Sequence, residues 1–293
     1  MNENEFAARV AALGGQLYVV GGWVRDRLIG RPAEDRDYVV CGLDAATLER
    51  EFQVRAVGRQ FPVYLLEVGG RLSEVALART ERKTGTGYRG FEARFSPDTT
   101  IEEDLYRRDT RMNSMAVRLP GGELIDPFGG RADIERRVIS ATSEHFRDDP
   151  VRALRAARQA AQLGFSIEGE TYGAIREIAP NLKNVSKERI QVELTKLLTS
   201  AHPEKIAMVE DTGISPYVTG DFPLVFQTER ERTAGGTSGP ESFSCLALLP
   251  PEKSMRWAGF LRHMEPDMVR RILKGLKLDN ETVDNGKAMA GAA

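Results

Sequence analysis

The stretch LYVVGGWVRDRLIGRPAEDRDYVV, residues 17–40, joins a short apolar run to a glycine pair and carries two aspartates one residue apart near its end. The apolar run predicts a strand, and Gly21 and Gly22 predict a tight turn into a helix, because glycine has no Cβ to obstruct the backbone. Main-chain N–H groups at such a turn suit an oxyanion such as a triphosphate, and Arg25 in the first helical turn adds a cationic partner. A plain strand-to-helix connection is the alternative interpretation of the glycines.

Asp35 and Asp37 flank Arg36 at the start of the next apolar run. Alternate residues of a strand point to one face, so the two carboxylates repel each other unless a cation lies between them. Mg²⁺ takes carboxylate oxygens together with substrate phosphates, so we predict that this pair binds Mg²⁺. Glu74, in the stretch 72–83, is the candidate for a third catalytic carboxylate on a neighbouring strand, completing a two-metal site. The alternatives are a solvated strand end and a rim glutamate, each paired with nearby arginines.

The composition predicts a globular chain that lies outside membranes. Of 293 residues, 41% are hydrophobic and 29% are charged, and no run reaches the roughly 18 to 20 apolar residues of a membrane span. The N-terminus lacks the basic-then-apolar order of a secretory signal, and Cys41 and Cys245 form no CxxC pattern, so we expect free buried thiols in the cytoplasm. The net charge of −2 restricts any nucleic-acid contact to a local basic patch.

Hydrophobic spacing divides the chain into a mixed first part and a helical second part. Short apolar runs predict strands at residues 17–20, 37–40, 61–68 and 72–79, with a helix at 45–52. From about residue 144 onward, apolar residues recur every three or four positions and predict helices at 148–165, 169–179, 187–198, 202–213 and 255–278. The polar, glycine-bearing stretch 228–240 predicts a loop or linker. The fold class is therefore α+β.

A local concentration of arginines begins near residue 136 and continues into the first long helix. Asp149 followed by Pro150 predicts the start of that helix, with the aspartate as its cap. Arg152, Arg155 and Arg158 follow at three-residue steps and share one broad side of the helix. A solvated arginine face is one interpretation, and a basic patch for nucleic acid is the other.

Several segments, in chain order, resemble the motifs of class II CCA-adding tRNA nucleotidyltransferases and bacterial poly(A) polymerases. They are GGWVRD, DRDYVV, ALARTERKTGTGY, EEDLYRRDTRMNSMA, LIDPFGG and RDDPVRALRAARQAAQLGF. The resemblance extends from about residue 17 to about residue 198. It implies an α+β chain with a polymerase-β-like nucleotidyltransferase head, a mixed sheet with helices, followed by an all-α neck and body. We expect the head at 1–137, the neck at 138–200 and the body at 201–293, with a tail domain missing or reduced.

The resemblance also implies roles for individual residues. Asp35 and Asp37 bind the catalytic Mg²⁺, and Glu74 stays the candidate third carboxylate. The residues that bind the nucleotide are Gly21, Gly22, Arg25, Arg108, Asp109, Asn113, Asp149, Arg152, Arg155 and Arg158.

Two segments between the predicted strands and helices leave alternatives open. Residues 81–100 have the glycine content of a mobile loop and resemble the family's flexible loop, which favours an enzyme able to add the terminal A; an ordinary connection is the alternative. Arg107 and Arg108 fit either the nucleotide pocket or surface charges paired with the acidic residues before them. Relatives usually carry Phe-Thr or Leu-Thr where this chain has Thr110-Arg111, a difference that bears on packing near the ribose.

In the family, the residues that match Asp149 and Arg152 act as a protein template for base selection. Cytosine and adenine both present an exocyclic amino donor beside a ring-nitrogen acceptor. An ionised aspartate accepts from the amino group and an arginine donates to the ring nitrogen, whereas guanine and uracil present a carbonyl oxygen and a ring N–H at those places. The pair therefore predicts that CTP and ATP are accepted and that GTP and UTP are rejected.

The sequence as a whole predicts an Mg²⁺-dependent, template-independent enzyme of the cytoplasm that adds CCA to the 3′ end of tRNA. CTP and ATP are its substrates, tRNA is its partner, and pyrophosphate is released. Three alternatives stay open: a poly(A) polymerase, an enzyme that adds only CC or only A, and a catalytically inactive RNA-binding module. The intact Asp-x-Asp pair argues against the last of these.

Overall fold

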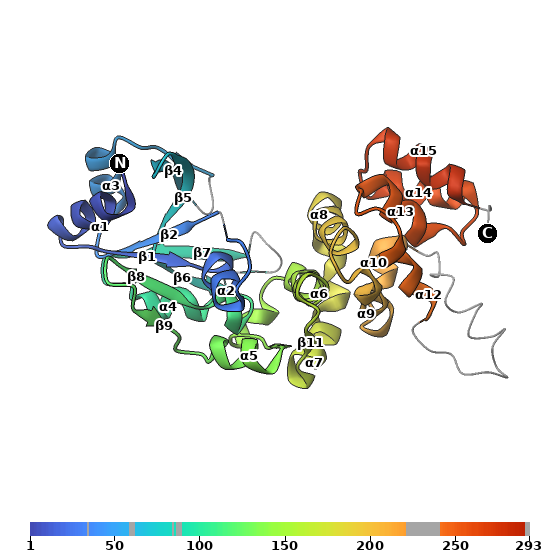
Figure 1. The fold of residues 1–293 in the computed structure, drawn as a ribbon, viewed down its shortest axis with the longest axis horizontal. Helices are drawn as coiled ribbons and strands as arrows, with labels where there is room; N and C mark the ends of the chain where they lie inside the picture. The colour runs from blue at the N-terminus through green and yellow to red at the C-terminus, as the bar shows by residue number, and fades with distance from the viewer. Residues whose placement is uncertain (34, 59–61, 84, 86–89, 221–240, 291–293) are drawn as a thin grey trace. The chain divides into compact units, whose positions relative to one another are not determined.

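The computed structural model describes residues 1–33, 35–58, 62–83, 85, 90–220 and 241–290. The chain forms two compact units, Met1–Asp148 and Asp149–Ala293. The first contains a mixed sheet with helices and the second is almost entirely helical (Figure 1), which confirms the predicted α+β class. The boundaries of the head, neck and body stay predictions. The predicted linker at 228–240 lies outside the described residues.

The first unit is built on a seven-stranded sheet with the strand order β3-β4-β5-β2-β1-β8-β9. Its strands are β1 (Gln16–Val20), β2 (Asp37–Cys41), β3 (Ala56–Val57), β4 (Val63–Val68), β5 (Arg71–Leu77), β8 (Ala116–Leu119) and β9 (Leu124–Ile125). Neighbouring strands are antiparallel except β2 and β5, which run parallel. All four predicted strands are therefore present in this unit.

Helices cover both faces of this sheet because its central strands are apolar on both sides. On one face, Phe6 of α1 makes edge-to-face contacts with Tyr38 of β2 and Phe52 of α3, at 5.7 and 5.2 Å between ring centroids. On the other face, Leu105 of α4 is fully buried in a cluster with Val20 and Val39. The remaining elements of the unit are α1 (Glu3–Ala12), α2 (Gly22–Ile29), α3 (Ala45–Phe52), α4 (Ile101–Tyr106), α5 (Gly130–Arg136) and β10 (Val138–Ile139), with 3-10 turns at Arg111–Asn113 and Glu144–Arg147.

The segment predicted as a mobile loop contains parts of two paired strands. Strand β6 (Arg79–Lys83) pairs antiparallel with β7 (Phe91–Phe95) from Arg79 opposite Phe95 to Lys83 opposite Phe91. The glycines between the two strands dominated the sequence interpretation, whereas the flanking residues alternate and pair as strands do. The tip, residues 84 and 86–89, lies outside the described residues, so its predicted mobility stays a prediction.

The second unit consists of short and medium helices (Figure 1). Its elements are α6 (Val151–Leu163), β11 (Ser166–Ile167), α7 (Gly169–Ile178), α8 (Lys187–Leu198), α9 (Ala207–Asp211), α10 (Ser215–Thr219), α12 (Glu241–Ser244), α13 (Lys253–Leu261), α14 (Pro266–Gly275) and α15 (Asn280–Met289), with 3-10 turns at Ala179–Asn184, Pro203–Ile206 and Cys245–Leu248. The stretch predicted as helical at 255–278 is helical but contains two helices, α13 and α14, because Pro266 starts a new helix where its missing N–H costs nothing.

The sequence interpretation missed α15, whose small residues serve close packing. A Cβ on Gly286 would lie 2.7 Å from Leu273 Cδ1 on α14, so glycine allows the two helices to approach closely. Within the described ranges, no helix is long and apolar enough to cross a membrane. Cys41 and Cys245 are free but only half-buried, not fully buried as expected.

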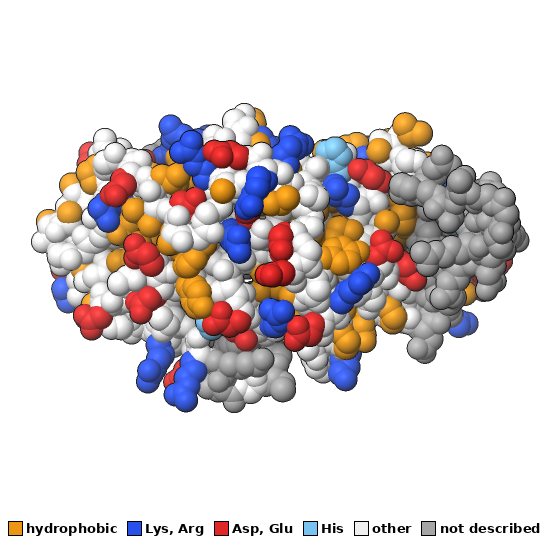
Figure 2. Space-filling model, turned by 90° about the horizontal axis from the view of Figure 1, so that it is seen from below, with side chains coloured by type: hydrophobic (Ala, Val, Ile, Leu, Met, Phe, Trp, Pro, Cys, Tyr) orange, Lys and Arg blue, Asp and Glu red, His pale blue; other side chains and the backbone are white. Residues whose placement is uncertain are grey.

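Basic and acidic side chains are interspersed on the face of the molecule that Figure 2 shows. The sequence contains 41 Lys and Arg residues against 43 Asp and Glu residues. No broad field of one sign is expected from this mixture, so contact with phosphates depends on local arrangements of arginine.

Candidate active site

The glycine turn lies between the end of β1 and the start of α2. Gly21 has φ of 71° and ψ of −134°, a backbone conformation that only glycine adopts readily. A Cβ at this position would lie 3.4 Å from Arg108 Nη1, so the turn and this guanidinium are in direct proximity. Gly22 has no comparable requirement, since a Cβ there would meet Arg25 Nη2 at an ordinary 3.5 Å. The turn therefore places the N-terminus of α2 beside two arginines, an arrangement that suits phosphate oxygens.

Asp37, the second carboxylate of the Asp-x-Asp segment, lies beside this turn, and Asp35 precedes the strand. Asp37 is opposite Val20 in the antiparallel pairing of β2 with β1, one residue before the turn. The parallel pairing of β2 with β5 sets Tyr38 opposite Val75, so Asp37 and Glu74 occupy equivalent positions one residue earlier on adjacent strands. Both point to the face on which Val39 packs against α4. The expected placement of Glu74 on a neighbouring strand is found, and its catalytic role stays a prediction.

The electrostatic environment of Asp37 combines like and opposite charges. Asp37 is accessible to water at the start of β2, but the surrounding protein still removes part of its hydration, which raises the pKa of its carboxyl group. The negative charges of Glu74 and Asp35 also raise this pKa, whereas Arg108 lowers it. The net shift is upward, so a cation placed among the three carboxylates would relieve real repulsion. Over the part of the chain that the structure describes, no three His, Cys, Asp or Glu side chains form a ready-made metal cluster.

Three of the predicted nucleotide-binding residues form one hydrogen-bonded chain. Arg25 donates through Nη1 to Asn113 Oδ1 at 2.8 Å, and its Nε and Nη2 donate to the two oxygens of Asp26 at 2.9 and 3.0 Å. Asn113 Nδ2 donates to Asp109 Oδ1 at 3.3 Å, and the same oxygen accepts from the backbone N–H of Thr110 at 2.8 Å. The guanidinium of Arg25 is therefore held in a fixed orientation at the first turn of α2.

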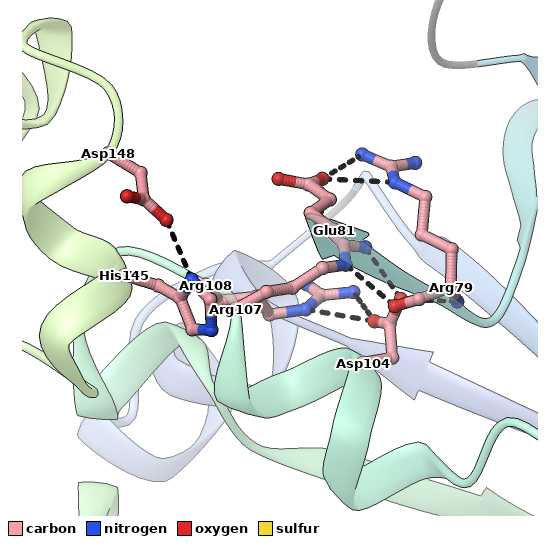
Figure 3. A network of polar contacts seen from close by, with 7 residues as sticks. All are labelled: Arg79, Glu81, Asp104, Arg107, Arg108, His145 and Asp148. Atoms are coloured by element: carbon pink, nitrogen blue, oxygen red, sulfur yellow. Dashed lines mark hydrogen bonds and ion pairs between the residues drawn. The ribbon is translucent and has the colours of Figure 1, made fainter. Parts of the chain in front are cut away.

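A buried carboxylate, one of the acidic residues that the sequence interpretation offered as partners, holds the Arg-Arg pair at the end of α4. Asp104 is fully buried, and its two oxygens bind different arginines: Oδ1 accepts from Arg107 Nη2 at 2.5 Å and Oδ2 from Arg108 Nη2 at 2.9 Å (Figure 3). The two arginines do pair with an acidic residue of that helix, as one interpretation expected. They are not surface charges, however, because only 11% and 20% of their side chains are exposed.

Arg107 also ties this cluster to the hairpin. Its Nη1 donates to Glu81 Oε1 of β6 at 2.9 Å and its Nε donates to the carbonyl oxygen of Arg79 at 3.0 Å. The side chain of Arg79 in turn pairs with Glu81 at 3.1 Å (Figure 3). Burial and the neighbouring Arg107 lower the pKa of Arg79 to about 10, so it stays charged at neutral pH. Asp104 and Glu81 thus form ion pairs with three guanidinium groups, those of Arg79, Arg107 and Arg108.

The charges around Asp104 decide its protonation state. Complete burial would raise the pKa of its carboxyl group, but Arg107 and Arg108 outweigh burial and lower the pKa to about 2. Because this pKa lies below the ordinary value of 3.8, the ion pairs stabilise the fold at every pH above about 4 and lose that contribution as the pH falls through 2.

Replacing Asp104 by asparagine is expected to destabilise the first unit by about 3 to 5 kcal/mol, because two buried guanidinium groups lose their charged partner. In protein that is still folded at low temperature, kcat/KM for nucleotide incorporation is expected to fall by about a hundredfold, since Arg108 is no longer held beside Gly21. Chemical denaturation and single-nucleotide kinetics measure the two effects. Glu102→Gln, an exposed change on the same helix, is the control. An Asp104→Asn variant as stable and active as wild type would contradict the anchoring role.

The predicted base-reading residues lie in the second unit, at the start of α6. Pro150 has helical dihedrals, with φ of −56° and ψ of −25°, and Asp149 Oδ1 accepts from the backbone N–H of Val151 at 3.1 Å. The predicted helix start is therefore present and Asp149 bonds to the first N–H of α6, but the helix begins at Val151 and Pro150, not Asp149, is in the cap position. Arg152, in the first turn of α6, is half-buried.

Helix α8 supplies charged partners to Asp149, Arg155 and Arg158. The sequence interpretation missed these partners. Arg189 Nη2 donates to Asp149 Oδ2 at 2.6 Å. Glu193 binds Arg158 through Oε2 at 2.6 Å and lies 3.9 Å from Arg155 through Oε1. Arg158 is only 15% exposed, so a solvated arginine face does not describe it. The spacing of Arg189 and Glu193, four residues apart in a helix, was the one available signal.

Comparisons of the sequence with known proteins find the family that the sequence motifs resemble. Residues 17–140 match the family model of the poly(A) polymerase head domain, and residues 164–222 match a probable RNA and SrmB-binding site of polymerase A. A multifunctional CCA protein of Aromatoleum aromaticum is 48% identical over 198 residues, which are 66% of this chain and 47% of that protein. A multifunctional CCA protein of Haemophilus influenzae is 46% identical over 194 residues, 64% of this chain and 46% of that protein.

Solved structures of CCA-adding enzymes are also similar to this chain. The Bacillus stearothermophilus CCA-adding enzyme in complex with CTP matches 100% of this chain and 70% of its own, with 30% identity and a TM-score of 0.75. The Thermotoga maritima CCA-adding enzyme complexed with tRNA matches 96% of this chain and 67% of its own at 24% identity and a TM-score of 0.66, which supports the fold alone.

The fold and the match of residues 17–140 define a protein with a poly(A) polymerase head domain. The chain belongs to the family of CCA-adding tRNA nucleotidyltransferases and bacterial poly(A) polymerases. It spans about half the length of the curated relatives it matches.

Proposed function

We propose that this protein adds C, C and A to the 3′ end of tRNA from CTP and ATP and releases pyrophosphate. The observation that carries this proposal is the convergence of Asp37 and Glu74, on adjacent strands, with Arg108 and the Gly21 turn. The names of its relatives, multifunctional CCA proteins and CCA-adding enzymes, support the same reaction. The cytoplasm, where tRNA is available and free cysteines persist, is the expected compartment.

The carboxylates present fit a hard divalent cation. Asp35 and Asp37 offer oxygen ligands, and Glu74 adds a third carboxylate whose charge raises the pKa of Asp37 when no cation balances it. Bound Mg²⁺, as one ion or two, would supply positive charge to the attacking and leaving oxygens. The test of this assignment is the first prediction of the Discussion.

The protein's own groups position the triphosphate and the primer for transfer. The N-terminus of α2 and the guanidinium groups of Arg25 and Arg108 bind phosphate oxygens. The 3′ hydroxyl of the RNA gives up its proton to solvent and attacks the α-phosphorus in line, a new P–O bond forms, the bond to the bridging oxygen of the β-phosphate breaks, and pyrophosphate leaves. Asp149 and Arg152 read the pairing edge of the base, which admits cytosine and adenine.

Incubation of the protein with Mg²⁺, each nucleoside triphosphate in turn and a tRNA transcript lacking CCA tests the proposal. We expect two additions with CTP alone, none with UTP or GTP, and three with CTP and ATP together. Transcripts that end before, within or after CC distinguish a CC-only or an A-only enzyme. Long adenylate tails on RNA other than tRNA would show a poly(A) polymerase, and no incorporation on any RNA would refute the proposal.

Deleting residues 85–90 from the β6–β7 hairpin is expected to impair addition of A more than addition of C. The strands of the hairpin are tied to the Arg-Arg pair through Glu81, so a shortened tip changes a segment that is linked to the nucleotide pocket. Rates of C and A addition on matched tRNA transcripts measure the effect. Equal losses in the two rates would remove the selective role of the hairpin.

A further inference from the structure

A groove of about 300 Å³ lies between α2 and the strand pair β8–β9 in the first unit. Helix α2 forms one side with residues at i and i+4, which share a helix face. The two strands form the other side, because Val117 and Leu124 are directly opposite each other and share a face of the sheet. The groove is lined by Trp23, Val24, Arg27, Leu28, Val117 and Leu124. Its volume is at the lower end of the range for small-molecule sites, about 300 to 1,000 Å³.

This groove is separate from the candidate active site. Val117 pairs with Val19 of β1, and the neighbours of both residues, Ala116 and Val20, belong to the cluster beneath α4. Side chains of a strand alternate between the two faces, so Val117 lies on the face opposite to α4. Asp37, which pairs with Val20, is on the α4 face. The groove and the carboxylates are therefore on opposite faces of one sheet.

Arg27 gives the groove a positive charge that the protein does not balance. The other residues that line it are apolar side chains and Gly122. Its guanidinium lies 5.1 Å from the centroid of the Trp23 ring, and over the described part of the chain it forms no ion pair or hydrogen bond. Within the same ranges, the indole N–H of Trp23 also forms no hydrogen bond. The groove thus combines apolar walls with donors that lack an acceptor.

We propose that this groove binds a small apolar carboxylate, such as an aromatic acid. The guanidinium fork of Arg27 matches the two oxygens of a carboxylate, and the indole N–H is a further donor. The apolar walls remove a flat hydrocarbon body from water. A cation would be repelled by Arg27, and an inorganic phosphate would leave the apolar walls hydrated. This site does not depend on the proposed transfer reaction, because it shares no residue with the nucleotide site.

Titration of the isotope-labelled full chain with naphthoate tests the inference through the indole N–H resonances. The chain has two tryptophans, Trp23 and Trp257, and Trp23→Phe assigns the two resonances by removing one. We expect naphthoate to shift the Trp23 resonance until it saturates. The resonance of Trp257 is expected to stay in place, because Trp257 is fully buried in the second unit. The neutral analogue naphthamide is expected to bind about tenfold more weakly, because it carries no charge for Arg27.

Three variants separate the charge of the groove from its shape. Arg27→Met is expected to weaken naphthoate about tenfold, to the affinity of naphthamide. Arg131→Met, which removes an exposed charge on α5 outside the groove, is the matched control and is expected to bind as wild type does. Leu28 is 41% exposed, so Leu28→Glu adds a negative charge at the rim and is expected to weaken naphthoate more than naphthamide. Thermal unfolding checks each variant, and Leu28→Glu carries the comparison if Arg27→Met does not fold.

Saturating CTP with Mg²⁺ is expected to leave the naphthoate affinity unchanged. Displacement by CTP would show that naphthoate occupies the phosphate site of Arg25 and Arg108, and it would overturn the inference. The absence of a saturable shift, or equal affinities for naphthoate and naphthamide in the wild type, would do the same. Sedimentation at the titration concentration covers the last alternative. A dimer that Leu28→Glu converts to monomers would assign the groove to a second copy of the chain and would also overturn the inference.

Discussion

Replacing Asp37 by alanine is expected to abolish addition of both C and A, with kcat/KM reduced by about a thousandfold or more. The carboxylate lies at the end of β2 next to the Gly21 turn, where a metal ion and the phosphates of the substrate would meet. The fold is expected to stay intact, because the like charges of Glu74 and Asp35 already disfavour an ionised Asp37. The loss is therefore a loss of chemistry and not of structure.

Single-nucleotide incorporation on tRNA, measured over a range of Mg²⁺ concentrations, checks this result together with thermal unfolding. Glu67→Ala is the matched control, because Glu67 is an exposed carboxylate on β4, two strands from Asp37 in the same sheet. It is expected to change neither activity nor stability. Substantial turnover by a folded Asp37→Ala protein would show that the carboxylate holds no essential metal.

Local sequence patterns predicted the parts of the fold that depend on near neighbours. Residues 45–52 and 187–198 are helices with the expected bounds, since apolar spacing and a capping residue act within a few positions. The hairpin at β6 and β7 was missed because its glycine-rich centre masked two short strands. The break before Pro266 was missed although a proline at a helix start was visible, because the apolar spacing continues across it.

The candidate site was predicted where residue types alone carry the chemistry. The glycine pair and the two aspartates needed no tertiary information, and Glu74 needed only the assumption that β5 adjoins β2, which the sheet order confirms. The way the ion-pair partners of the arginines are buried and connected could not be predicted from the sequence. That Asp104 lies at helical spacing from Arg107 and Arg108 was readable, but its complete burial and the additional contact with Glu81 depend on how the hairpin packs.

Replacing Asp149 by asparagine is the second change with a large expected effect. The structure shows that this replacement affects stability as well as nucleotide choice. Oδ1 and Oδ2 both accept from donors, the Val151 N–H and Arg189, so an amide must turn its NH₂ group toward one of them. This mismatch is expected to cost about 1 to 3 kcal/mol of stability. A simple exchange of one helix cap for another would cost far less, because asparagine is also a good cap.

The same exchange is expected to alter nucleotide choice. The NH₂ group that replaces one of these oxygens has a second N–H, which can donate to O4 of uracil, as a carboxylate cannot do. The ratio of kcat/KM for CTP to that for UTP on tRNA lacking CCA is therefore expected to fall by about tenfold to a hundredfold. Arg152→Ala is expected to move the ratio in the same direction, because the donor for the ring nitrogen is gone.

Asp148, which directly precedes Asp149 in the sequence, provides a control for this replacement. Asp148 pairs with His145 at 2.7 Å in the first unit, so Asp148→Asn removes a carboxylate next to Asp149 without touching the base-reading pair. It is expected to keep the ranking of CTP and ATP over UTP and GTP. If Asp149→Asn also keeps that ranking while losing stability, Asp149 is a helix cap and a partner of Arg189, and base selection must be carried by other residues.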